Sequence, residues 1–310
     1  MSAPAPRRLL LIDAGRGFAV VAMVAYHLVW DLGNFDYIDR YFPYSPQFKS
    51  VGHEIALSFL FIAGVSLALA HRRNPEFGPF WRRIGRIAAA AALVSLGTYL
   101  VFPQAFVFFG ILHCIAAASL LAAPFLFLPW PAALVAAALA FLAPRFLAAP
   151  VFDTPWLSWI GLATLEPSTN DWRPFLPWSG ALLAGVAFAE FPGALEALGA
   201  LQESRDAGAT SVMGALRWLG RHSLAIYLLH QPLLFGVFLA LAQLSAPRED
   251  QLANFVAACE TRCEADGGAI DFCQAACLCV EARSREGHLP NEPAERALRL
   301  RALAEDCVKL

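Results

Sequence analysis

The sequence predicts an all-α polytopic membrane protein: a bundle of about seven to eight transmembrane helices followed by a small C-terminal cysteine-rich helical hairpin. Of the 310 residues, 58% are hydrophobic and only 15% are charged, whereas about a quarter of a soluble domain is charged. Several apolar segments reach the roughly 20 residues that a helix needs to cross a bilayer. The C-terminal segment is instead charged, and it holds six of the seven cysteines.

Seven apolar segments are expected to form the spans. A shorter apolar stretch, Trp156–Leu165, is interpreted as a re-entrant or interfacial segment. If it crossed the bilayer fully, the count would be eight. The seven segments are 9–32, 53–70, 86–102, 105–124, 130–149, 175–191 and 222–244.

Basic residues predict the orientation, because they concentrate in cytoplasmic loops. The 71–86 connection holds five arginines, and Arg7 and Arg8 precede the first span, which lacks a cleavage site. We therefore expect a retained first span with a cytoplasmic N-terminus. The 33–52 and 150–174 loops and the C-terminal tail would then lie outside, in the periplasm of a bacterium with this protein in its inner membrane. The aromatic residues of these loops fit an interfacial belt, with a sugar-stacking surface as the alternative.

Composition and motifs exclude several classes of function. The formal net charge is -2, which suggests neither a nucleic acid nor an acidic partner. The chain lacks GxGxxG, Walker, HExxH and GxSxG motifs. We therefore expect no permanently bound cofactor and no metal in the membrane region.

Four ionisable side chains lie on one face of the first span. Asp13, Arg16, His27 and Asp31 are separated by steps that combine threes and fours, the spacing of one helix face. Ionisable groups at bilayer depth cost several kcal/mol each unless they are paired or hydrated. This face is therefore expected to line a cavity.

The spacing suggests a role for each of the four. Asp13 and Arg16 can neutralise each other, or Arg16 can bind a phosphate or carboxylate. Asp31 follows His27 at i+4, where its carboxylate could accept a hydrogen bond from the ring and fix the tautomer. Such a pair is the base and orienting group of an acyl-transfer site. The alternative is that His27 and Asp31 only link helices.

The last span carries a second polar face. Ser223, Tyr227 and His230 share it by i+4 and i+3 steps, and Pro232 frees a backbone carbonyl near Leu228. Such a break beside polar side chains is common at binding sites. It also occurs in membrane helices that have no such role.

Other polar residues are weaker candidates. His113 is a lone polar residue in an apolar span, which favours a structural histidine over a pocket residue. Asp171 and Trp178 precede and open the sixth span, where turn and belt roles would explain them, although Asp171 could reach a substrate. His53 and Glu54 open the second span and are expected at its interface.

Five motifs in order resemble a known family. Over residues 8–245 the chain is similar to bacterial relatives of the heparan-alpha-glucosaminide N-acetyltransferase catalytic domain. In the wider integral-membrane acyltransferase superfamily, an Arg–Gly pair and a later histidine open the acyl-transfer site, which corresponds here to Arg16–Gly17 and His27. The motifs are IDAGRGFAVVAMVAYHLVWDL, FLFIAGVSLALA, FFGILHCIAAASLL, DWRPFLPWSGALLAG and LGRHSLAIYLLHQPLLF.

The resemblance implies a transferase that moves an acyl group, usually acetyl, from cytoplasmic acyl-CoA to a sugar amine or hydroxyl. His27 would be the general base, with an acyl carrier as the alternative, and Asp31 its orienting group. Arg16, with Asp13, would hold the CoA end or brace the helix. The expected partners are the lipid bilayer, acetyl-CoA as donor substrate and a saccharide acceptor. The rival interpretation is a non-enzymatic carrier or assembly partner. The remaining pocket residues would be His113, His230, Tyr227, Asp171 and Trp178.

The tail has a cysteine pattern of its own. Cys259 and Cys263 form one CxxxC pair, and Cys273 and Cys277 form another, with a turn at Gly267–Gly268 between them. Two antiparallel helices would place Cys259 against Cys277 and Cys263 against Cys273. Two disulfides could then stabilise a segment whose hydrophobic core is thin.

Three further expectations concern this tail. Cys279 and Cys307 are candidates for a third bridge. The alternatives are a thiolate metal site, although zinc ligands more often come as CxxC, and a reduced cytoplasmic tail. The domains are accordingly placed at 1–245 for the transmembrane acyltransferase unit and 246–310 for the tail.

Overall fold

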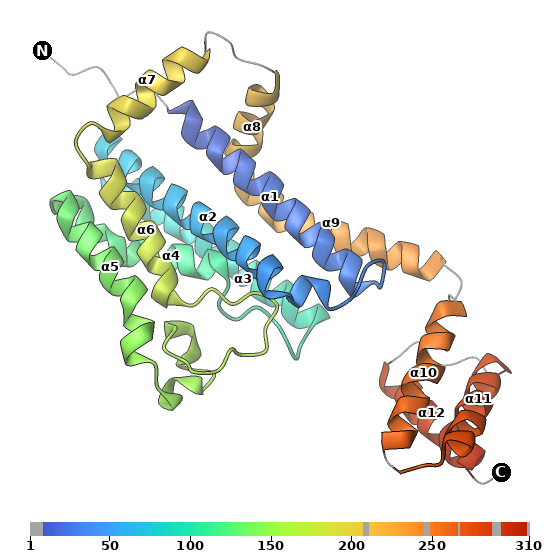
Figure 1. The fold of residues 1–310 in the computed structure, drawn as a ribbon. Helices are drawn as coiled ribbons and strands as arrows, with labels where there is room; N and C mark the ends of the chain where they lie inside the picture. Colours follow the sequence, from blue (N-terminus) through green and yellow to red (C-terminus); the bar gives the residue numbers. More distant parts are fainter. Residues whose placement is uncertain (1–8, 207–210, 245–248, 266, 287–292, 309–310) are drawn as a thin grey trace, which may run out of the picture. The chain divides into compact units, whose positions relative to one another are not determined.

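The computed structural model describes residues 9–206, 211–244, 249–265, 267–286 and 293–308, and every long element in these ranges is a helix (Figure 1). The all-α prediction is therefore confirmed. The chain divides into two compact units, residues 1–238 and 239–310. The domain boundary at residue 245 stays a prediction.

Nine helices within the described residues begin in the first unit, and the last of them ends in the second. A 3-10 helix, η2 (Ala123–Phe127), directly extends α4. The nine are α1 (Leu10–Asn34), α2 (Pro46–Arg73), α3 (Phe77–Val101), α4 (Ile111–Ala122), α5 (Trp130–Leu147), α6 (Phe175–Glu190), α7 (Ala194–Asp206), α8 (Ser211–Arg221) and α9 (Ser223–Leu244).

Each of the seven predicted apolar segments contains a helix. By length and composition, five helices of the described chain can cross a membrane: α1, α2, α3, α5 and α9. A sixth span results if α6 and α7, which are bent by 81° to each other, count as one. The segment Ile111–Phe127 is apolar but shorter. Trp156–Leu165 contains only the 3-10 turn Ser158–Ile160, far shorter than a crossing requires.

The helices run between two ends of a bundle. The arginine end comprises the start of α1, residues 72–86, α7 and α8, and the loop end comprises the connections 35–45, 102–110 and 148–174. Arg72 contacts Glu190 at 2.7 Å at the arginine end, and the Asn170 amide donates to the Ala105 carbonyl at the loop end. Phe127 at the end of η2 packs on His71. Because α4 begins at the loop end, α4 with η2 passes from one end to the other despite its short length.

Helix α6 forms the centre of this unit, and Figure 1 shows it between α2 and α5. Most of its side chains are buried. Where it crosses α2, a Cβ atom on Gly64 would overlap the Leu182 carbonyl, and one on Gly185 would overlap the Phe61 carbonyl. Small residues that let two backbones approach are the usual basis of helix packing in membranes.

Several helix ends differ from the sequence expectation. Helix α2 begins at Pro46 rather than 53, because Ser45 caps it by accepting from the Phe48 amide at 3.4 Å. His53 and Glu54 therefore lie two turns inside α2 instead of opening it. Helix α3 begins at Phe77 rather than 86, so the expected 71–86 loop shrinks to residues 74–76. The five arginines expected in this loop therefore lie in the last turn of α2 and the first three turns of α3. A helix can carry them there because the aliphatic part of an arginine side chain can extend along apolar surface.

The long connection 148–174 is fixed by side-chain hydrogen bonds. Asp153 accepts from the Thr164 hydroxyl and amide, both at 2.6 Å, and from the Leu165 amide at 3.1 Å. These bonds, above all that from the Thr164 hydroxyl, hold the pKa of Asp153 below its ordinary value. The stabilisation of the loop is therefore present above the ordinary carboxyl pKa and is lost as the pH falls through the lowered one.

The second unit contains the predicted helical hairpin. Helix α10 (Glu249–Ala265) and α11 (Ile270–Glu286) are joined by two disulfides, Cys259–Cys277 and Cys263–Cys273, with Cα atoms 5.9 and 5.6 Å apart. These are the pairs expected for antiparallel helices. Since these four cysteines are bonded to one another, they leave no thiolates for the alternative metal site.

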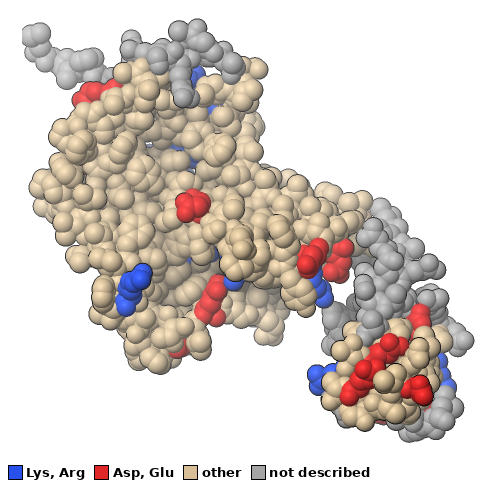
Figure 2. All heavy atoms as spheres, in the orientation of Figure 1, with Lys and Arg blue, Asp and Glu red and all other residues tan. Residues whose placement is uncertain are grey.

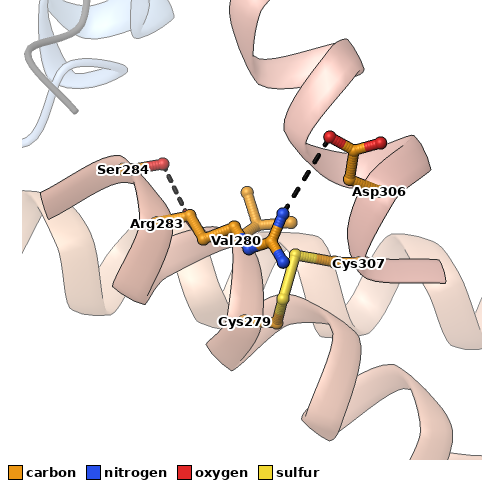
Figure 3. The surroundings of a disulfide bond; sticks show 6 residues. All are labelled: Cys279, Val280, Arg283, Ser284, Asp306 and Cys307. Atoms are coloured by element: carbon orange, nitrogen blue, oxygen red, sulfur yellow. Dashed lines mark hydrogen bonds and ion pairs between the residues drawn. A yellow bond between two sulfur atoms is a disulfide. The ribbon is translucent and has the colours of Figure 1, made fainter. Parts of the chain in front are cut away.

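A third helix completes this unit. The disulfide Cys279–Cys307 joins α11 to α12 (Pro293–Val308), as Figure 3 shows. Beside it, Arg283 contacts Asp306 at 3.9 Å, and Val280 is buried against α12. Figure 2 shows Asp and Glu side chains gathered on the visible face of this unit, whereas the visible face of the first unit is mostly uncharged.

Candidate functional site

Two histidines from different helices meet inside the first unit. His27 on α1 and His230 on α9 have ring centroids 4.7 Å apart. His27 Nδ1 lies 3.0 Å from the Met23 carbonyl and 3.0 Å from His230 Nε2. A carbonyl oxygen can only accept a hydrogen bond, so we assign the proton of His27 to Nδ1.

The backbone fixes the partner ring in the same way. His230 Nδ1 lies 2.8 Å from the Tyr227 carbonyl and 3.2 Å from the Ile226 carbonyl. It therefore carries the proton, and His230 Nε2 accepts from His27. His27 Nε2 keeps its lone pair, which is what a general base requires.

Asp31 does not orient His27, which corrects the sequence expectation. Its Oδ1 accepts a hydrogen bond from Gln231 Nε2 at 3.0 Å, and its side chain is fully buried. Long side chains in a helix lean toward the N-terminus, and His27 accordingly contacts Met23 rather than the following turn. Asp31 Oδ2 and Gln231 Oε1 have no hydrogen-bond partner within the described residues.

A second cluster lies at the loop end. Asp171 Oδ2 accepts from the Ile111 amide at 3.0 Å and so holds the first turn of α4. The guanidinium of Arg173 lies 5.0 Å from the centre of the buried Trp178 ring. The other ring contact of Trp178 is to His53, edge to face at 5.3 Å.

This cluster acts on one member of the histidine pair, His27. Besides His230, the side chains of Asp171 and Arg173 interact electrostatically with His27. The same two charges act on Tyr227, whose ring lies 5.8 Å from that of His230. His27, His230, Tyr227, Asp171 and Arg173 therefore belong to one region. Arg173 was not among the residues predicted from the sequence, although its place in the motif DWRP, between two pocket candidates, was a usable signal.

His113 has a structural explanation. Its Nδ1 accepts from the Gly110 amide at 3.2 Å, and its Nε2 lies 3.2 Å from the Ser95 hydroxyl. Ser95 in turn donates to the Val107 carbonyl at 2.6 Å. Both ring nitrogens are thus occupied in joining α3 to the start of α4. We therefore leave His113 out of the proposed pocket.

Asp13 and Arg16 lie at the arginine end, away from the histidines. Arg16 Nη2 donates to the Ser66 hydroxyl at 2.6 Å, and Asp13 lies 3.6 Å from both Arg16 and Arg221. A Cβ atom on Gly17 would overlap a backbone carbonyl of α8. The glycine of the Arg–Gly pair is therefore explained by close helix packing.

Two pockets open at this end. One, of about 230 Å³, is lined by Asp13, Arg16 and Arg73 among others. The other, of about 490 Å³, is lined by Pro79, Arg82 and Arg86. Arginine side chains of this kind suit phosphate groups.

Comparison with known protein families shows to which family the chain belongs. Residues 8–232 match a family described as heparan-alpha-glucosaminide N-acetyltransferase, catalytic. The chain belongs to this family. Its membership and its apolar helices make it a member of a membrane acyltransferase family. No curated protein and no solved structure matches the chain.

Proposed function

We propose that this protein transfers an acetyl or other acyl group from acyl-CoA to the amine or hydroxyl of a sugar, with His27 as the general base. The observation that carries the proposal is the arrangement of His27. Its Nδ1 proton is held by the Met23 carbonyl and His230, which leaves Nε2 free to accept a proton. The family supplies the reaction class, and the histidine pair supplies the chemistry.

The donor would bind at the arginine end. The two pockets there are lined by Arg16, Arg73, Arg82 and Arg86, which suit the phosphates of CoA. Arg16 and His27 are eleven residues apart, a distance of about 16 Å along a helix. CoA carries its thioester at the end of a long flexible arm, so bound phosphates and a reacting thioester at this separation are compatible.

A single general base, His27, is sufficient for the proposed reaction. As the sugar nitrogen or oxygen attacks the thioester carbonyl carbon, His27 Nε2 takes the proton from that nitrogen or oxygen. The carbon–sulfur bond breaks, and the CoA thiolate recovers the proton from the imidazolium. His230 Nε2, which accepts from His27 Nδ1, stabilises the positive charge on His27 during this exchange.

The proposal includes a location. The arginine end would face the cytoplasm of a bacterium, and the loop end would face the periplasm across the inner membrane. Acyl-CoA would then approach from the cytoplasm and the saccharide from the outer side. The part of the second unit that follows α9 would be periplasmic.

The test uses full-length protein in nanodiscs with acetyl-CoA and glucosamine, and it measures CoA release and the acetylated product. We expect His27→Ala to lower turnover by roughly 10²–10⁴-fold. The control is His222→Ala, because His222 is an exposed histidine immediately before α9. Normal turnover in His27→Ala would contradict the assignment of the base. Wild-type protein that neither binds nor hydrolyses acetyl-CoA would favour the non-enzymatic rival.

A further inference from the structure

Asp31 is a buried acid that forms no ion pair with any described residue. Its side chain is fully buried on α1, and its one polar partner is Gln231 on α9. The bond between them runs from Gln231 Nε2 to Asp31 Oδ1 at 3.0 Å. A buried carboxylate stays charged where an opposite charge or several hydrogen bonds compensate it. Asp31 meets neither condition.

Two oxygens of this pair lack a hydrogen-bond donor. Asp31 Oδ2 and Gln231 Oε1 are both buried, and neither has a partner within the described residues. A carboxylate oxygen and an amide oxygen can only accept, so the two groups cannot satisfy each other while Asp31 is charged. Both atoms have almost no accessible surface, which leaves no room for a water molecule to donate to them. A proton on the carboxyl group itself is the donor that fits.

A protonated Asp31 completes the pair. A carboxylic acid and a primary amide form two hydrogen bonds side by side, from the amide N–H to one carboxyl oxygen and from the acid O–H to the amide oxygen. The first of these is the bond from Gln231 Nε2. The second would run from Asp31 Oδ2 to Gln231 Oε1, the two atoms that otherwise remain unsatisfied.

The pair lies beside the two histidines. Asp31 follows His27 by one turn of α1, and Gln231 directly follows His230 on α9, whose Nε2 accepts from His27 Nδ1 at 3.0 Å. The two pairs therefore join the same two helices at adjacent levels. Pro232 comes next in α9 and has no backbone N–H, so the helix loses one of its own hydrogen bonds there. A side-chain connection to α1 at this level helps to fix the position of α9.

We propose that Asp31 is a neutral carboxylic acid that donates to Gln231 Oε1, and that this pair of hydrogen bonds holds His230 in place against His27. Asp31 is then a positioning residue, because it contacts neither histidine nitrogen and acts through Gln231. The protonation of Asp31 is independent of the reaction, whereas its effect on turnover rests on the proposed function.

Infrared spectroscopy of full-length protein in nanodiscs tests the protonation. A carboxylic acid has a carbonyl stretching band at higher frequency than a carboxylate or an amide. At neutral pH, the difference spectrum of wild-type protein minus Asp31→Asn should contain this band, and the band should shift in D₂O. The control is Asp36→Asn, because Asp36 is an exposed acid 3.6 Å from Arg40. Its difference spectrum should lack the band.

Turnover of the same variants tests the positioning. Asp31→Asn should retain turnover, since its amide N–H replaces the acid O–H. Asp31→Leu leaves the Gln231 amide unpaired and should lower kcat by about fivefold or more without changing the KM for acetyl-CoA. The double variant Asp31→Asn, Gln231→Glu exchanges the acid and the amide while both side chains keep their shapes. It should restore the acid band and retain turnover.

Two results would overturn the proposal. Absence of the acid band from wild-type protein would show that Asp31 is charged, and normal turnover of Asp31→Leu would show that the pair does not position the histidines. If Asp31→Leu fails to fold, the exchanged double variant decides the second point, because loss of its turnover has the same meaning. The spectra require no substrate, so failure of the protonation is distinguishable from failure of acyl transfer itself.

Discussion

The proton on His27 Nδ1 has two acceptors, and a substitution can remove only one of them. The Met23 carbonyl belongs to the backbone of α1 and stays in place. His230 can be replaced, and its Nε2 contributes the second acceptor at 3.0 Å. Asp31 contacts neither ring nitrogen of His27 and is hydrogen-bonded to Gln231 instead. Substitutions of the two candidate orienting residues, His230 and Asp31, are therefore expected to have different effects on turnover.

We expect His230→Ala to lower kcat by about five- to tenfold, because one hydrogen bond to the base is lost and one remains. The KM for acetyl-CoA should not change, since His230 lies away from the arginine end. Asp31→Asn should retain kcat within about twofold, because its amide oxygen can still accept from Gln231. Steady-state kinetics of both variants measures the difference. An Asp31→Asn variant as impaired as His27→Ala would restore Asp31 as the orienting residue.

The sequence located most of the region around His27 for a simple physical reason. His230, Asp171 and Trp178 are residue types that stand out in or beside apolar spans, so composition alone selects them. Their partners could not be inferred in this way. An i+4 spacing places Asp31 on the correct face of α1, but side chains in a helix lean toward its N-terminus, so His27 contacts Met23 instead. The packing of Arg173 against Trp178 is a tertiary contact that no periodicity encodes.

At the element scale, the packing of α2 against α6 depends on glycines rather than on large side chains. Gly64 lies against the backbone of α6, and Gly185 lies against that of α2. Some other glycines of the bundle have no such contact. Gly97, near the C-terminal end of α3, has no neighbouring atom within 4 Å of the position that a Cβ would take. The two kinds of glycine provide a matched comparison.

We expect Gly64→Ala to destabilise the protein, because the new Cβ would meet the carbonyl of Leu182, and α2 and α6 would have to separate. Gly97→Ala should be neutral or stabilising by about 0.5–1 kcal/mol, since alanine is the better helix former. Thermal unfolding in detergent measures both. Equal effects of the two substitutions would show that close backbone contact does not hold this crossing.

The ends of the helices were less predictable than their existence. Hydropathy marks the part of a helix that suits lipid, and the structure extends α2 and α3 beyond that part at their N-termini. Helix α4 differs in the opposite direction, because it is shorter at its N-terminus than the sequence predicts. It begins at Ile111 rather than 105, because Asp171, 60 residues away in sequence, accepts from its first amide. A cap supplied from so distant a segment leaves no local signal.

At the scale of the whole molecule, the three disulfides of the second unit bear on topology. Disulfides persist in oxidising compartments such as the bacterial periplasm and are rare in the cytosol. The bonds close sequence separations of 10, 18 and 28 residues. Closing loops of this size restricts the unfolded chain and typically stabilises a small domain by about 2–4 kcal/mol per bond. The cysteine pattern and the arginine distribution therefore favour the same orientation by independent physical arguments.

We expect the six cysteines of the second unit to resist a maleimide in intact, unreduced protein and to react after a reductant is added. Cys114 is buried in the first unit, so it should contribute little to labelling of the folded protein. Phosphatase fusions give a second measurement of the same orientation, inactive after Arg73 and active after Leu310.

The control for the labelling is the double variant Cys279→Ser, Cys307→Ser. It removes only the bond between α11 and α12, so the Cys259–Cys277 and Cys263–Cys273 pairs should still resist labelling. Rapid labelling of Cys259 or Cys273 without reductant would contradict the disulfides. Fusion signals of equal sign would contradict the orientation, because the chain would then have the wrong parity of crossings between Arg73 and its C-terminus.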